Sequence, residues 1–215
     1  MTTIGFIGSG HIGSQLARLA ISTGDSVVMS NSRGPDTLAE LIAELGPQAS
    51  AGTVQDAAER GDIVVVTVPL AAIETIPAAQ LAGKLVIDTN NYYFERDGHI
   101  AALDAAQTTV SEILAAHLPG STIVKVFNNI HSGDLTTTGS PTGTPDRRAL
   151  PVASDDADAT AAVIALLDRF GFDAVDAGAL SEGWRYERDT PPYGVPLDAA
   201  GLAAALASTT RTASV

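Results

Sequence analysis

The chain has 215 residues, of which 45% are hydrophobic and 17% charged, with 20 glycines and no cysteine. This length suits one large domain, or one domain with a small annex, and the apolar content excludes a disordered chain. The missing cysteine excludes disulfides, zinc–thiolate sites, iron–sulfur clusters and cysteine catalysis, and no motif predicts another metal site.

The formal net charge of −13 argues against nucleic-acid and anionic-membrane partners. No apolar run reaches the roughly 18 residues that a membrane span needs. Residues 1–5 carry no basic segment before the first apolar stretch, so we expect no secretory signal. Together these features predict a cytoplasmic protein that acts on a small molecule.

Short apolar runs and amphipathic segments alternate along the chain. In chain order, strands are predicted at residues 4–7, 26–30, 62–68, 84–88, 122–127, 149–153 and 173–176. Helices are predicted at residues 12–20, 37–45, 53–59, 73–81, 111–118, 157–170 and 197–207. The run at 62–68 is too uniformly apolar and β-branched for a strand with one wet face, and is typical of a buried parallel strand.

This alternation of strand and helix predicts an α/β fold: a Rossmann-type, doubly wound, mostly parallel sheet with a small C-terminal α/β annex. We expect a dinucleotide-binding domain at residues 1–148. The annex at residues 149–215 would contribute to the substrate cleft and to dimer contacts. Residues 133–145 are polar and rich in Gly and Pro, which predicts a mobile loop, and residues 208–215 predict a frayed end.

The strongest motif is a glycine cluster between the first strand and the first helix. Its pattern GxGxxG comprises Gly8, Ser9, Gly10, His11, Ile12 and Gly13. Gly8 permits a tight turn, Gly10 lets the backbone approach a pyrophosphate, and Gly13 lets helix and strand pack closely. A glycine-rich turn without a ligand is the alternative, but the strand–turn–helix context favours a dinucleotide site.

The end of the second strand selects between the two nicotinamide dinucleotides. NAD-binding proteins place an acidic residue there, whereas this chain has Asn31, Ser32 and Arg33 and no acid before Asp36. A hydroxyl and a guanidinium suit a 2′-phosphate, so the sequence favours NADP(H) over NAD(H), unless Arg33 is an ordinary solvated arginine.

Ligands of open parallel sheets lie beyond the carboxyl ends of the strands. Thr67, Val68 and Pro69 at one such end are expected along the nicotinamide ribose. At the next, Asn90 and Asn91 are candidates for contact with an amide or a ring, unless this stretch only caps a turn.

A third strand end carries the candidate catalytic residues Asn128, Asn129 and His131. Two amides can orient a carboxamide or a ring, and a histidine can donate a proton near neutral pH. A surface histidine before a loop is the alternative. No other catalytic motif is present, and hydride transfer between two rings needs little acid–base chemistry.

These segments together resemble a known family. The resemblance rests on residues 4–13 (IGFIGSGHIG), Ser32–Arg33, residues 67–69 (TVP), residues 150–156 (LPVASDD) and residues 176–180 (DAGAL). The chain is similar to the NADPH-dependent coenzyme F420 reductases (F420H2:NADP oxidoreductases), whose Rossmann domain is shared with STEAP-type ferric reductases.

The resemblance implies an NADP-binding Rossmann domain, a homodimer and hydride transfer between nicotinamide and the deazaflavin F420 or a related flavin. It places Ser9, His11 and Ile12 at the pyrophosphate and Ser32 and Arg33 at the 2′-phosphate. The chain departs from the family at Asn128–Asn129, where a His–Thr pair is expected, and at residues 184–193, which match no family pattern.

Two other functions remain open. The same NADPH site could serve reduction of an imine or a carbonyl, or the protein could be a non-catalytic NADP(H) sensor. The positions of Trp184 and Tyr186 distinguish these readings: a planar second substrate is indicated if both face the cleft beside Asn128 and His131.

Overall fold

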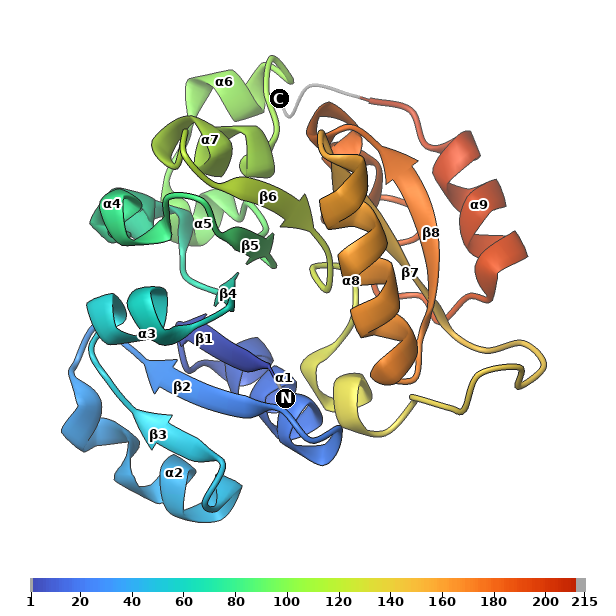
Figure 1. The fold of residues 1–215 in the computed structure, drawn as a ribbon. Helices are drawn as coiled ribbons and strands as arrows, with labels where there is room; N and C mark the ends of the chain where they lie inside the picture. Colours follow the sequence, from blue (N-terminus) through green and yellow to red (C-terminus); the bar gives the residue numbers. More distant parts are fainter. Residues whose placement is uncertain (1, 212–215) are drawn as a thin grey trace.

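A single sheet organises the molecule, and the computed structural model describes residues 2–211. The strands are β1 (Thr3–Ile7), β2 (Ser26–Ser30), β3 (Ala49–Ala51), β4 (Ile63–Val66), β5 (Leu85–Asp88), β6 (Thr122–Lys125), β7 (Ala149–Ser154) and β8 (Asp173–Gly178). They form one eight-stranded sheet in the order β3-β2-β1-β4-β5-β6-β7-β8 (Figure 1). Every neighbouring pair is parallel except β6 and β7. This order confirms the doubly wound α/β fold, and its direction reverses between β1 and β4, where such sheets bind ligands.

Helices connect the strands. They are α1 (His11–Ser22), α2 (Ala39–Leu45), α3 (Val54–Arg60), α4 (Ala78–Leu81), α5 (Phe94–Asp97), α6 (Ala101–Asp104), α7 (Val110–His117), α8 (Ala157–Arg169) and α9 (Ala199–Ser208). The short 3₁₀ helices are η1 (Pro35–Leu38), η2 (Leu70–Thr75), η3 (Ser132–Thr136) and η4 (Leu180–Tyr186). Within the described residues, no helix combines the length and apolarity that crossing a membrane requires.

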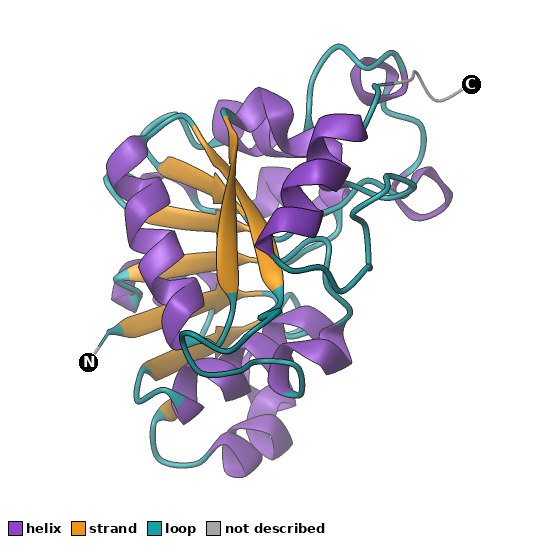
Figure 2. Ribbon diagram, turned by 90° about the vertical axis from the view of Figure 1, so that its right-hand side faces the viewer, coloured by secondary structure: helices purple, strands orange, loops and turns teal. Residues whose placement is uncertain are grey.

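Both faces of the sheet are covered (Figure 2). Successive residues of a strand point to opposite faces, so Val65 joins one apolar core with α1 and α8, while Val64 and Val66 join another with α3 and α7. All three valines are buried. This is the two-sided burial that the uniform apolar run at 62–68 predicts.

Several helices begin where the sequence places a capping side chain. Thr53 and Thr109 form capping boxes with the third residue of α3 and α7, and the Asp156 side chain accepts the Ala159 N–H at the start of α8. Each cap satisfies a backbone N–H that the helix itself leaves unpaired. Helix α1 differs, because its N-cap residue Gly10 supplies no side-chain hydrogen bond.

The C-terminal strands extend the same sheet. β7 runs antiparallel to β6, and β8 pairs with β7 in parallel. One face of this pair packs on α8, and the other packs on α9 through Ala153, Leu202 and Leu206. The segment η4 then crosses toward α7 and β6, so the chain after β8 returns to the carboxyl ends of β5 and β6.

Two loop predictions are partly wrong. Residues 133–136 of the predicted mobile loop belong to η3, which packs on α1 and buries Leu135 completely. At the C-terminus, Thr209 is buried and Arg211 donates a hydrogen bond to the Thr108 carbonyl, so these residues are not frayed. The remainder of that predicted frayed end, residues 212–215, lies outside the described residues.

Other differences concern short elements. The sequence did not predict β3, α5 or α6, which have three or four residues each and too little length for a hydrophobic period. The helix expected at 73–81, with a break or a start near Pro77, is divided there into η2 and α4, because proline cannot donate a backbone hydrogen bond.

Candidate dinucleotide site and active site

The glycine turn requires glycine at two positions for steric reasons. Gly8 has φ of 115°, and a Cβ there would lie 2.1 Å from the Thr67 carbonyl oxygen. A Cβ on Gly13 would lie 2.3 Å from the Gly8 carbonyl oxygen. Gly10 is different, because no described atom beyond its chain neighbours comes within 4 Å of a Cβ built there. The open side of Gly10 is therefore available to a ligand.

Helix α1 presents an anion-binding end beside this open position. Its first backbone N–H groups have no side-chain cap, and its first turn has no acidic residue. Unpaired N–H groups and the helix dipole together favour a negative group. Exposed His11 and half-buried Ile12 begin the helix. The geometry fits the pyrophosphate of a dinucleotide.

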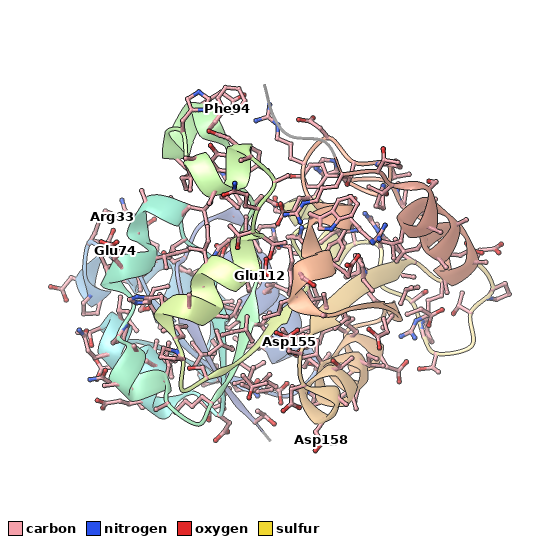
Figure 3. The ribbon with its side chains drawn as sticks, turned by 90° about the horizontal axis from the view of Figure 1, so that it is seen from above. Arg33, Glu74, Phe94, Glu112, Asp155 and Asp158 are labelled. Carbon is pink, nitrogen blue, oxygen red and sulfur yellow. The ribbon has the colours of Figure 1, made fainter. Side chains whose placement is uncertain are left out.

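Asn31 joins the glycine turn to the loop after β2. Its Nδ2 donates to Thr37 Oγ1 at 2.9 Å and to Ser9 Oγ at 3.3 Å, and its Oδ1 accepts the Arg33 N–H at 2.9 Å. Ser32 and Arg33 are exposed, and Figure 3 labels Arg33 at the edge of the molecule. Within residues 2–211 the Arg33 guanidinium forms no ion pair, so it is free to bind a phosphate.

Amide side chains hold the ends of β4, β5 and β6 together. Asn90 Oδ1 accepts the Val68 N–H at 3.0 Å. Asn91 Nδ2 donates to the Asn128 carbonyl at 2.8 Å, and Asn128 Nδ2 donates back to Asn91 Oδ1 at 3.1 Å. The predicted residues of these three strand ends therefore lie side by side. The exposed Pro69 follows Val68 at the mouth of the crevice.

The two candidate catalytic asparagines also hold the segment that matched no family pattern. Asn128 Nδ2 donates to the Tyr186 carbonyl at 3.0 Å, and Asn129 Nδ2 donates to the Pro192 carbonyl at 3.4 Å. Both residues are buried, but Oδ1 of each has no hydrogen-bond partner among the described residues. His131 is exposed and lies beside Gly194: a Cβ built on Gly194 would be 3.0 Å from Nε2 of His131.

A buried ionic cluster beneath these strand ends was missed from the sequence. Lys125 Nζ lies 3.9 Å from Asp88 Oδ2 and 3.0 Å from Glu187 Oε1, and it donates to the Asn90 carbonyl at 3.1 Å. The contact with Glu187 is an ion pair without the geometry of a hydrogen bond. Burial raises the pKa of the Asp88 carboxyl, and Lys125 and the Ser111 hydroxyl oppose that rise. In the sequence, this cluster is indicated only by Asp88 and Lys125, the charged residues at the ends of the otherwise mostly apolar strands β5 and β6.

A cavity of about 390 Å³ opens between the segment after β5 and the segment after η4. Trp184 lines it, with the guanidinium carbons of Arg185 and Arg211 at 4.6 and 5.7 Å from the indole ring centre. Glu187 also lines this cavity, while Tyr186 is fully buried and its hydroxyl donates to the Lys125 carbonyl. Trp184 thus faces a cavity that neither Asn128 nor His131 lines, and Tyr186 is buried away from it, so the two aromatic residues do not both face a cleft beside Asn128 and His131.

Comparisons with known proteins agree with this geometry. Residues 3–92 match the family described as NADP oxidoreductase, coenzyme F420-dependent. The hypothetical protein SMa0349 of Sinorhizobium meliloti is 29% identical, with a TM-score of 0.79 over 92% of this chain and 96% of that one. No curated protein matches this chain.

Two further solved structures share the fold at lower identity. A proposed F420-dependent NADP reductase of Arthrobacter sp. FB24 is 22% identical, with a TM-score of 0.72 over 84% of this chain and 86% of that one. An imine reductase of Myxococcus stipitatus is 21% identical, with a TM-score of 0.58 over 84% of this chain and 56% of that one.

Proposed function

Because residues 3–92 match the coenzyme F420-dependent NADP oxidoreductase family, we propose that this chain transfers a hydride between NADP(H) and coenzyme F420 or a related flavin. The cofactor would lie across the carboxyl edge of the sheet. Gly8–Gly13 and the start of α1 would hold its pyrophosphate, and Ser32 and Arg33 its 2′-phosphate.

The observation that carries the proposal is the combination of two features at this edge. An uncapped helix start faces the open side of Gly10, and an unpaired guanidinium stands at the end of β2 where NAD-binding proteins place an acid. A carboxylate at that place would repel a 2′-phosphate, whereas Arg33 attracts it. The nicotinamide, when bound, supplies the hydride, and the chain orients it and excludes water.

The acceptor would bind at the far end of the same crevice. Thr67–Pro69 and Asn90–Asn91 would border the nicotinamide half. The Oδ1 atoms of Asn128 and Asn129 are buried and have no hydrogen-bond partner among the described residues, so they would meet an acceptor only if the segment after η4 moved away from them. The choice of F420 or a flavin as the acceptor is therefore supported by the family match and not by these two residues.

Reduction of an imine is the second candidate function. It is favoured by the imine reductase whose fold this chain shares, although that likeness alone shows only the fold. A sensor that binds NADP(H) without turnover is the third.

NADPH oxidation by the purified protein tests these candidates directly. Parallel assays would contain coenzyme F420, FMN or the cyclic imine 2-methyl-1-pyrroline, and NADPH binding would be titrated separately by fluorescence. Turnover with F420 or FMN supports the proposal. Turnover with the imine alone transfers the assignment to the second candidate, and tight NADPH binding without any turnover favours the sensor.

A further inference from the structure

Two tyrosine hydroxyls from distant parts of the chain meet at the carboxyl edge of the sheet. The hydroxyls of Tyr93 and Tyr193 are hydrogen-bonded to each other across 100 residues of sequence. Both side chains are half-buried. Neither is used by the site described above, and their pairing gives the crevice an O–H donor that the sequence did not reveal.

The pair stands at the ends of β5 and β6. Tyr93 follows Asn91 by two residues, and its N–H donates to Asp97 Oδ2 at 3.0 Å. Tyr193 precedes Gly194, whose N–H donates to the Asn129 carbonyl at 2.8 Å. Tyr93 therefore follows the carboxyl end of β5, and Tyr193 is anchored beside the segment after β6, so both belong to the edge of the sheet at which the proposed nicotinamide site would lie.

Two guanidinium groups flank the ring of Tyr93. The guanidinium carbon of Arg96 lies 4.9 Å from the ring centre, and that of Arg188 lies 5.3 Å from it. Tyr93, Arg96 and Arg188, with Glu95, line an open concavity of about 780 Å³. Positive charge beside a phenol stabilises the phenolate that remains after the proton has left.

The charged groups around the pair include partners of both arginines. Arg96 pairs with Asp97, and Arg188 pairs with Glu95 and more loosely with Asp189. Across the pair, the exposed His131 lies beside Gly194.

The two hydroxyls have different roles because their surroundings differ. Tyr93 lines the concavity, whereas Tyr193 does not. The pKa of Tyr193 is raised, mainly by burial and next by the hydrogen bond with Tyr93. Asp189 adds to this rise, and Arg188 opposes it. Tyr193 therefore keeps its proton and can donate a hydrogen bond to an ionised Tyr93.

We infer that Tyr93 is the proton donor of the reaction and that Tyr193 positions it, for an acceptor with a C=N group. This inference rests on the proposed function. The acceptor carbon gains a hydride with its two electrons from NADPH, which becomes NADP⁺, while the Tyr93 O–H bond breaks and an N–H bond forms on the acceptor. Tyr93 then recovers a proton from water, so that one NADPH and one proton are consumed in each turnover.

Tyr93→Phe and Tyr193→Phe test this assignment in the full-length protein, because phenylalanine keeps each ring. With F420 or 2-methyl-1-pyrroline as the probe, Tyr93→Phe should lower kcat by about 100-fold or more and leave the Kd for NADPH unchanged. The solvent deuterium isotope effect on kcat should disappear in this variant. Tyr193→Phe should cause a smaller loss of kcat and keep the solvent isotope effect, because Tyr93 keeps its hydroxyl but loses the hydrogen bond that positions it.

Tyr186→Phe is the matched control, because it removes a buried tyrosine hydroxyl outside the pair. It should lower Tm and preserve the solvent isotope effect.

The failures are distinguishable. If the parent binds no NADPH, or turns over neither F420 nor FMN, the proposed hydride transfer to F420 or a flavin is wrong; if it turns over no acceptor at all, the inference falls with it. If the parent is active with F420 or the imine and Tyr93→Phe keeps its kcat and its solvent isotope effect, the inference alone is overturned. A Tyr193→Phe variant that keeps the parental kcat would contradict the positioning role of Tyr193.

Discussion

Arg33 is the residue on which the choice of dinucleotide depends. It is exposed, forms no ion pair within residues 2–211 and follows Asn31, whose side chain fixes the turn. Arg33→Ala should weaken NADPH binding by about 1.5–3 kcal/mol, the contribution of a hydrogen bond to a charged group, and leave NADH binding nearly unchanged. Fluorescence titration with both dinucleotides measures the difference.

The matched control for Arg33 is Arg60→Ala. Arg60 is an exposed arginine at the C-terminal end of α3, the helix that leads into the start of β4 at the opposite edge of the sheet. This variant should keep the parental ratio of the two affinities. Equal losses of NADPH and NADH affinity in Arg33→Ala would refute the 2′-phosphate role.

Gly10 and Gly8 should respond differently to an added side chain. Gly10→Val should abolish dinucleotide binding and leave Tm close to the parental value, because the added atoms enter open space. Gly8→Ala should instead lower Tm, because its Cβ would overlap the Thr67 carbonyl. Calorimetry and NADPH titration of both variants separate the two effects, and retained NADPH affinity in Gly10→Val would discredit the phosphate cradle.

At the scale of secondary-structure elements, the ends of β5 and β6 and the segment after η4 meet in the cluster of Asp88, Lys125 and Glu187. Lys125→Met removes the buried cation and leaves two carboxylates without it, which should cost about 3–5 kcal/mol in the free energy of unfolding at neutral pH. Urea unfolding at several pH values measures this cost.

The cost of Lys125→Met should shrink as the pH falls. Burial already raises the pKa of Asp88, and loss of the cation raises it further. When the pKa of a carboxyl is higher in the folded protein than in the unfolded chain, protonation favours the folded state. This stabilisation is complete at a pH below the pKa of the unfolded chain, and it is lost as the pH rises through the pKa of the folded protein. Lys84→Met is the control: Lys84 Nζ donates only to the Glu59 and Gly61 carbonyls, so its smaller cost should not depend on pH. A pH-independent cost for Lys125→Met would contradict the account.

The elements also show what could be predicted from the sequence. Strands β1, β2, β4 and β5 follow the apolar runs closely, because a strand buried on both faces permits few polar residues. Helices α3, α7 and α8 begin beside the capping residues that the sequence displays. By contrast, α5 and α6 are single turns that tertiary contacts maintain, such as the hydrogen bonds of Tyr92 to Asp104 and Gly98.

The candidate site was predictable only where it is local in sequence. The glycine turn and the β2 loop each lie within a few residues, so their geometry follows from the motif. The bonds from Asn128 and Asn129 to residues 186–194, and the pairing of Tyr93 with Tyr193, join segments 58 to 100 residues apart. No pattern within one sequence reveals such a pairing.

At the scale of the whole molecule, we expect a homodimer formed through α9. Its buried side, with Leu202 and Leu206, packs on β7 and β8, and its outward side exposes Ala203, Ala204 and Ala207. Small side chains let a second helix approach closely. Light scattering at micromolar concentration should give about twice the chain mass, and Ala204→Glu should reduce it to the monomer mass. A monomeric parent protein would contradict the expectation.

The antiparallel pairing of β6 with β7 bears on how such an enzyme could change its substrate. The strands from β1 to β6, which would carry the proposed cofactor site, are all parallel to their neighbours in this part of the sheet. Residues 187–194, between η4 and α9, would form the wall that faces the proposed acceptor. They are attached by the ion pairs Lys125–Glu187 and Glu95–Arg188 and by hydrogen bonds from Asn129 to Pro192 and between Tyr93 and Tyr193. That wall could be exchanged, in evolution or in engineering, without moving the register of any strand that serves the dinucleotide.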